Sequence, residues 1–420
     1  MSASRKIMQR IEALAKISED PGQLTRTFAS PAMHEANKLV ARWMREAGMK
    51  THVDPIGNLI GHYDGKKPNA KLLLLGSHLD SIRNAGKFDG PLGVILAIAC
   101  VEELHHKQAR LPFAIGVIGF CDEEGTRFQV PYLGSKAQAG CFDKKDFARK
   151  DADGISMAQS IKTFGGKPAN IASARLDPRK LVGYVETHIE QGPVLEQNNL
   201  AVGVVSAIAG QTRARVVFIG KAGHAGTTPM ELRKDALCAA AEMVLAAESL
   251  ARKMPGLVAT VGEISVKPGT SNVIPAEACL SLDIRHANDA VRKAATRTLA
   301  GKFFEIAKQR IMKGDFTIIH ETAAVECSKE LSTLLMEAVR KRQKKTIQLA
   351  SGAGHDAAVM AGITPSAMLF VRCKNGISHH PAESVKSADA KMALEIMGDF
   401  LQLLAGKYPH IVGSSGKTLL

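Results

Sequence analysis

The order of apolar and polar positions along the chain predicts alternating strands and helices. Short apolar runs lie at 71–77 (KLLLLGS), 113–121 (FAIGVIGFC) and 181–189 (LVGYVETHI), and helix-like segments such as 91–107 separate them. Continuous apolar runs of this length are typical of strands that are buried on both faces of a sheet. We therefore expect an α/β domain with a mostly parallel sheet and helices on both faces.

The pattern changes after residue 210. Segments such as QTRARVVFIGKAG and ACLSLDIRH alternate polar and apolar residues, and the stretches 230–253 and 287–313 have the character of long helices. Few strands with one polar face, together with two helices, predict a small sheet that is covered on one side only. The α/β pattern then returns and closes with a helix at about 386–405. We expect one domain formed by 1–210 and 327–420, and an inserted α+β domain formed by 211–326.

Composition narrows the class of protein. At 420 residues the chain is longer than one hydrophobic core usually serves, and its hydrophobic fraction of 45% is ordinary for a folded protein. No stretch approaches the roughly 18 apolar residues of a membrane-spanning helix, and the N-terminus lacks the apolar core of a signal peptide. The seven cysteines are widely scattered, which argues against a cysteine-zinc site. We expect a cytoplasmic protein that has no membrane partner.

The chain is basic, with 55 Lys and Arg against 41 Asp and Glu and a net charge of +14. Such a charge suits nucleic acid, an anionic surface or an anionic substrate. The only dense basic run, RKRQKK at 340–345, ends a helix-like stretch, where cations are favoured in any case. No aromatic-interleaved pattern accompanies it, so we expect no nucleic-acid partner.

Polar side chains end several of the predicted strands. In an open parallel sheet the ligand site forms at the carboxyl ends of the strands. The side chains collected there are imidazoles and carboxylates: His78, Asp80, Asp89, Asp122, Glu123, Glu124, His188, His379 and His380. This set suits zinc, or manganese if carboxylates dominate, and one shared carboxylate would allow two ions.

Simpler interpretations exist for each residue taken alone. Asp89 is placed to cap the helix that follows it, and a single histidine is more often a surface or core residue than a ligand. Capping does not explain why four separate apolar strands all end in ligand-type side chains. Of the two adjacent histidines, spacing favours His379 over His380.

Eight motifs, in order, resemble those of a known family. They are GSHLDSIRNAGKFDGPLGV, DEEGTRF, HIEQGP, GHAGTTPM, NVIP, DIR, SGAGHDA and GISHHPAE. They are similar to the motifs of the dinuclear-metal amidohydrolases that include allantoate amidohydrolase, N-carbamoyl-L-amino acid hydrolase and β-ureidopropionase. The resemblance runs from about residue 20 to 405.

The resemblance implies a role for seven residues of the strand-end set, whereas Asp122 receives none and His380 stands at a variable position. One divalent ion would be held by His78, Asp89 and His188, and a second by Asp89, Glu124 and His379, with zinc, manganese or cobalt as the metal. Asp80 would orient His78. Glu123 would be the general base, because it resembles the residue that takes a proton from water and returns it to the leaving nitrogen.

The resemblance also implies residues for the substrate and a lid. His224 would stabilise the oxyanion, typically from the partner subunit of a homodimer formed through the inserted domain. The remaining substrate residues would be Gln191, Gln211, Asn272, Arg285 and Gly354, and Arg372 is a further candidate. A guanidinium fork such as that of Arg285 suits a carboxylate.

The implied activity is metal-dependent hydrolysis of a ureido C–N bond in a small anionic substrate. Segments such as AIAGQTR (207–213) look most like the allantoate versions, which would place the chain in purine and ureide nitrogen catabolism. The alternatives are N-carbamoyl-L-amino acids or N-carbamoyl-β-alanine as substrate. A remote alternative is a catalytically inactive basic binding protein. Such a protein would be expected to lack metal ligands, whereas all five implied ligands and the implied general base are present in this sequence.

Overall fold

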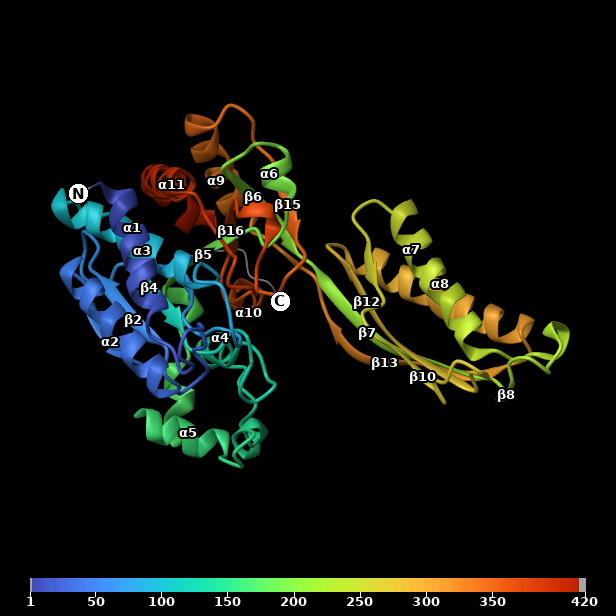
Figure 1. Cartoon of the computed structure of the whole chain (residues 1–420). Coiled ribbons are helices and arrows are strands. Elements are labelled where there is room, and N and C mark those ends of the chain that lie inside the picture. Colours follow the sequence, from blue (N-terminus) through green and yellow to red (C-terminus); the bar gives the residue numbers. More distant parts are fainter. Residues whose placement is uncertain (1, 415–420) are drawn as a thin grey trace. The chain divides into compact units, whose positions relative to one another are not determined.

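A computed structural model of the chain describes residues 2–414 (Figure 1). Position 1 and positions 415–420, which were assigned to the first predicted domain, lie outside the described residues. The chain divides into two compact units: unit 1 comprises the residues up to Ser206, Cys327–Leu349 and the chain from Gly354 onward, and unit 2 comprises Ala207–Glu326 and Ala350–Ala353. None of the described helices combines the length and the apolar character that crossing a membrane requires.

The larger sheet has nine strands in the order β1-β2-β4-β3-β5-β16-β6-β14, with β15 also paired to β6, and all of it belongs to unit 1 except β14 and the last residues of β6 and β15. The central strands β3, β4, β5 and β16 run parallel, whereas β1, β2, β6 and β14 pair antiparallel with their neighbours. The strands are β1 (Lys50–Val53), β2 (Leu59–Tyr63), β3 (Leu72–His78), β4 (Ala114–Phe120), β5 (Leu181–Ile189), β6 (Val202–Ile208), β14 (Val325–Glu326), β15 (Gln348–Ser351) and β16 (Ser366–Val371).

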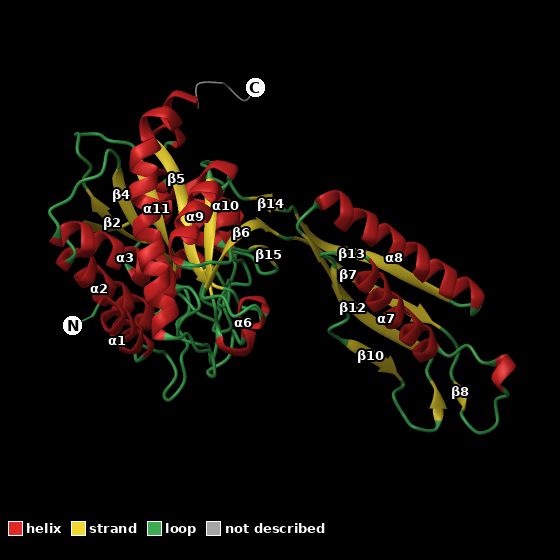
Figure 2. Ribbon diagram, turned by 90° about the horizontal axis from the view of Figure 1, so that it is seen from above, coloured by secondary structure: helices red, strands yellow, loops and turns green. Residues whose placement is uncertain are grey.

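Helices cover the sheet of unit 1 on both faces (Figures 1 and 2). One group, α1, α3, α9 and α11, packs together, and α4 packs against α10. The helices are α1 (Ala3–Ala15), α2 (Pro31–Glu46), α3 (Pro91–His106), α4 (Leu133–Ala139), α5 (Met157–Phe164), α6 (Val194–Gln197), α9 (Lys329–Arg342), α10 (Asp356–Met360) and α11 (Ser387–Ser414). Every residue of β4 and of β5 is buried, as expected for central strands covered twice. The predicted α/β architecture is confirmed.

Unit 2 contains a five-stranded antiparallel sheet with the order β10-β12-β7-β13 and β9 paired to β12. Helices α7 and α8 pack against this sheet. In β7, Thr212, Ala214, Val216 and Phe218 are buried, while Arg213 and Arg215, which alternate with them, are exposed. β8 and β11 form a separate ribbon. The elements are β7 (Gly210–Ile219), β8 (Gly223–His224), β9 (Val258–Thr260), β10 (Ile264–Lys267), β11 (Val273–Ile274), β12 (Glu277–His286), β13 (Lys313–Thr322), α7 (Ala236–Lys253) and α8 (Asp289–Gln309).

Helix α7 begins six residues later than the pattern at 230–253 predicts. Residues Met230–Leu232 form a separate 3₁₀ turn. Asp235 then caps α7, because its side chain accepts hydrogen bonds from the backbone N–H groups of Leu237 and Cys238.

Candidate active site

Five ligand-type side chains come together at the carboxyl ends of the parallel strands. His78 ends β3 and His188 lies near the end of β5, while Glu124 follows β4 and His379 follows β16. Asp89 lies just before α3, the helix that packs on β3 and β5. The strands are parallel, so their ends share one edge of the sheet, and this explains why residues so distant in the chain meet.

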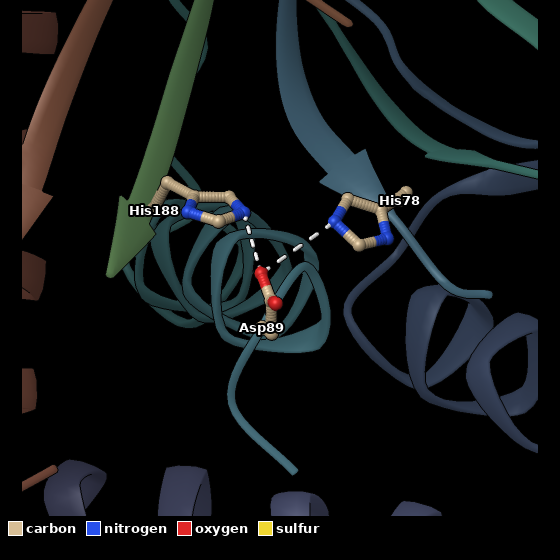
Figure 3. A group of neighbouring side chains, drawn as sticks. All are labelled: His78, Asp89 and His188. Carbon is tan, nitrogen blue, oxygen red and sulfur yellow. Dashed lines mark ion pairs between the residues drawn. The ribbon is translucent and has the colours of Figure 1, made fainter. Parts of the chain in front are cut away.

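The carboxylate of Asp89 lies between two sets of ligands. Its Oδ1 is 3.1 Å from His188 Nε2 and 3.9 Å from His78 Nε2 (Figure 3). Its Oδ2 is 3.1 Å from His379 Nε2, which in turn is 3.4 Å from Glu124 Oε1. Within each of the sets His78–Asp89–His188 and Asp89–Glu124–His379, one ligand atom per residue lies within 4.8 Å of the others. The geometry suits two cations that share Asp89.

His78 and His188 both turn Nε2, rather than Nδ1, towards Asp89. Nδ1 of His78 is 3.1 Å from the carbonyl of Asp80, and Nδ1 of His188 is 3.0 Å from the carbonyl of Ile189. A carbonyl accepts only, so each Nδ1 carries a proton, and Nε2 is the ring atom that could meet a cation once it has given up its own proton. His188 Nε2 is buried and has no hydrogen-bond partner among the described residues. A metal ion is the group that would satisfy this arrangement.

Asp80 supports the turn that carries the acidic residues. Its Oδ1 accepts the backbone N–H of Glu123 at 3.0 Å, and its Oδ2 accepts the backbone N–H of Glu124 at 3.1 Å. Asp122 Oδ1 accepts the N–H of Gly125 at 3.1 Å, which closes the turn. Asp122, for which the sequence offered no role, therefore shapes the backbone of its own turn.

The acidic residues repel one another and are buried. Burial raises the pKa of Glu123 well above its ordinary value, although the charge of His78 acts in the opposite direction. Burial and the charge of Asp89 raise the pKa of Glu124 to about 7. His78, Glu123 and Glu124 form a third set of closely spaced ligand atoms, so Glu123 lies beside both groups that would hold ions. Cations there would favour the ionised carboxylates.

Of the predicted substrate residues in unit 1, Gln191 lies close to these ligands. Gln191 Nε2 is 3.2 and 3.1 Å from the two carboxylate oxygens of Asp89 and 3.0 Å from Ser378 Oγ. Gly354 leaves room for Tyr132, because a Cβ at position 354 would lie 1.8 Å from the Tyr132 hydroxyl oxygen. The fork of Arg372 contacts both oxygens of Asp389, each at 2.8 Å.

The other predicted substrate residues lie in unit 2, in two separate groups. Arg285 donates from Nε and Nη2 to Asp283 at 2.8 and 3.0 Å, and Gln211 donates to the same carboxylate at 2.6 Å. His224 and Asn272 are neighbours on the β8–β11 ribbon, where the carbonyl of Asn272 accepts the N–H of Ala225 at 2.9 Å.

Two residues beside His188, Glu186 and His355, were not identified from the sequence. Glu186 accepts hydrogen bonds from Ser77 Oγ at 2.7 Å and from the N–H of Ala357 at 3.0 Å, and it forms a further set of ligand type with His188 and His355. The His355 ring lies 4.6 Å from that of His188, and burial holds its pKa well below the ordinary value. The sequence does contain a signal for Glu186: a carboxylate stands within the apolar run LVGYVETHI, two residues before His188, where a buried strand would otherwise be apolar.

Comparison with known proteins identifies relatives over nearly the whole chain. A model of peptidase family M20/M25/M40 matches residues 59–403. Allantoate deiminase 1 of Glycine max is 40% identical over 94% of this chain and 88% of its own length, and N-carbamoyl-L-amino acid amidohydrolase of Geobacillus stearothermophilus is 38% identical over 94% and 97%. A solved amidase of the hydantoinase/carbamoylase family from Burkholderia multivorans superposes with a TM-score of 0.90 at 29% identity, covering 95% and 97% of the two chains.

Proposed function

This chain belongs to peptidase family M20/M25/M40 and is a hydrolase, and on that premise we propose that it cleaves a ureido C–N bond of allantoate. The reaction would consume water and release ammonia, carbon dioxide and a ureidoglycine-type product. The observation that carries the proposal is Asp89, which lies between His78 and His188 on one side and His379 and Glu124 on the other.

Two divalent ions held by these five residues would act as Lewis acids that lower the pKa of bound water towards about 7. Glu123 would take the proton from the attacking water and return it to the leaving nitrogen. Its burial supports this role, because a raised pKa brings a carboxylate nearer to the working pH of a general base.

His224 is proposed to donate a hydrogen bond to the developing oxyanion. Its Nδ1 accepts the backbone N–H of Gly226 at 3.1 Å, so in the neutral ring the proton lies on Nε2. The exposed Nε2–H is then available as a donor, as the oxyanion role requires.

The choice of allantoate rests on the polar cluster of Gln211, Asp283 and Arg285. Arg285 and Gln211, which Asp283 holds side by side, would receive the carboxylate and the second ureido group, which allantoate has and an N-carbamoyl amino acid lacks. The relatives named N-carbamoyl-L-amino acid amidohydrolase keep that substrate class as the second candidate.

The proposal includes a homodimer formed through unit 2. Strand β13 is an edge strand of its sheet, and it exposes Ile318 by 47% and Ile319 by 62%. Phe304 of α8, the helix that packs on β13, is 62% exposed. Apolar side chains on an unpaired edge favour pairing with a second copy, and light scattering would measure the mass.

The proposal further places the enzyme in the cytoplasm. All seven cysteines are free thiols, and Cys100, Cys121 and Cys373 are buried, as suits a reducing compartment.

The test is a parallel assay of manganese-reconstituted protein on allantoate, N-carbamoyl-L-methionine and N-carbamoyl-β-alanine. We expect allantoate to have the highest kcat/KM, and a preference for a carbamoyl amino acid would overturn the substrate assignment. Glu123→Gln should still bind two ions per chain and lose about 10²- to 10⁴-fold in kcat. Full activity of this variant would refute the role of Glu123.

A further inference from the structure

Glu383 connects the two loops that carry Asp89 and His379. Its Oε1 accepts the backbone N–H of Phe88 at 2.7 Å and that of Asp89 at 3.1 Å, and its Oε2 is 3.2 Å from Ser378 Oγ. Glu383 is only 2% exposed, and 295 residues separate it from Phe88. One buried carboxylate therefore holds the backbone at Asp89 and the hydroxyl next to His379.

Gly86 makes this approach possible. A Cβ at position 86 would lie 2.3 to 2.5 Å from the Cδ, Cβ and Oε1 atoms of Glu383. Any side chain there would push Glu383 away from the Phe88 and Asp89 amides, so the loop before Asp89 is shaped to admit this carboxylate.

The contacts of Ser378 are directed at one oxygen of Asp89. Its Oγ lies 3.1 Å from Asp89 Oδ2, accepts from Gln191 Nε2 at 3.0 Å, and can donate its single proton to Asp89 or to Glu383. Asp89 Oδ2 is the oxygen that faces His379, whereas Oδ1 faces His78 and His188. The Glu383–Ser378 pair thus acts on the Asp89–Glu124–His379 side of the centre.

We propose that Glu383 is a positioning residue that sets the affinity of the second cation site, formed by Asp89, Glu124 and His379, without touching ion or substrate. Glu383 fixes the backbone of Asp89 directly, and through Ser378 it fixes the loop that carries His379. It therefore sets the distance between Asp89 and His379, two of the ligands of the second site. The first site depends on Asp89 Oδ1, His78 and His188, whose imidazoles are oriented by other carbonyls. The inference rests on the metal-binding part of the proposed function.

The test is stepwise titration of metal-free protein with Mn²⁺ in competition with a chromophoric chelator. Glu383→Gln should weaken the second binding step about 10- to 100-fold, as is typical when a group that orients a ligand is changed, and should leave the first within about threefold. Ser378→Ala should weaken the same step, Ser378→Thr should restore it, and the double variant should lose less than the sum of both.

Glu190→Gln is the matched control. Glu190 is also buried and accepts two consecutive backbone N–H groups, those of Val194 at 2.7 Å and Leu195 at 2.8 Å, but it does not bond to Asp89 or Ser378. Both binding steps should be retained in this control. The inference is overturned if Glu383→Gln binds both ions like the parent, or if it loses both steps equally. A parent protein that does not bind two ions would instead refute the proposed function itself.

Discussion

Removal of the metal should make the stability of this protein fall as the pH rises from 5 to 8. The reason is Glu124, whose pKa is raised from 4.5 to about 7 by burial and by the charge of Asp89. A carboxyl whose folded pKa exceeds its unfolded pKa binds its proton more tightly in the folded state. Its ionisation therefore costs stability above pH 4.5, and the cost is complete only once the pH has passed about 7.

The size of the effect follows from these two values. Between pH 5 and pH 8, linkage predicts a loss of about 2.5 kcal/mol of unfolding free energy from Glu124. The imidazole of His379, whose pKa is raised to about 9 chiefly by its hydrogen bond with Asp89, acts in the same direction above pH 6.5. His355 acts in the opposite direction, because burial lowers its pKa.

A comparison with Glu124→Gln isolates the contribution of Glu124. Urea unfolding of chelator-treated protein should show the variant gaining about 2.5 kcal/mol on the parent between pH 5 and pH 8. With saturating Mn²⁺ the order should reverse, because the variant has lost a ligand while the ion neutralises the parent carboxylate. A parent-to-variant difference that stays flat with pH in the metal-free state would refute the electrostatic account of this cluster.

Two further substitutions test the substrate fork and the packing beneath the site. Arg285→Lys should raise KM for a carboxylate substrate about tenfold or more in steady-state assays, with a smaller change in kcat. The reason is that a lysine ammonium cannot reproduce the two hydrogen bonds to Asp283 and also bind a carboxylate bidentately. An unchanged KM would contradict this. Gly93→Ala should lower the unfolding free energy, measured by urea titration, by about 1–3 kcal/mol or more, because its Cβ would lie 2.1 Å from the carbonyl oxygen of Thr187. Gly301→Ala in α8 is the control: a Cβ there would have no atom within 4 Å, so this variant should be neutral or stabilising.

The positions at which the apolar strands end were sufficient to bring most of the proposed metal ligands together from sequence. An apolar run such as FAIGVIGFC has to be a buried strand, and parallel buried strands end at one edge, so His78, His188 and the acidic turn at 122–124 could be placed together without coordinates. Alternation along the segment that forms β7 likewise predicted a sheet with one polar face that is covered on one side only. Both inferences depend on the order of apolar and polar residues along the chain, which can be read directly from the sequence.

Other features depend on contacts that no local pattern encodes. Nothing near Glu383 in the sequence indicates that its carboxylate accepts backbone N–H groups 295 and 294 residues away, or that Gly86 has to be small to admit it. Residues 350–353 lie within an α/β stretch, yet they join unit 2, where the carbonyl of Gly352 accepts from Arg285 Nη1 at 2.7 Å. The start of α7 was misplaced because cap geometry at Asp235 outweighed the apolar periodicity before it.

The position of β16 in the sheet also has a consequence for biosynthesis. This strand leaves the ribosome well after β5 and β6, yet it lies between them in the sheet and pairs with both. Until residue 371 has been made, the parallel edge of β5 stays open and His379 is missing from the centre. Synthesis must therefore pass residue 371 before the interior of the sheet closes, and until then the N-terminal part exposes a bare strand edge of the kind that chaperones protect.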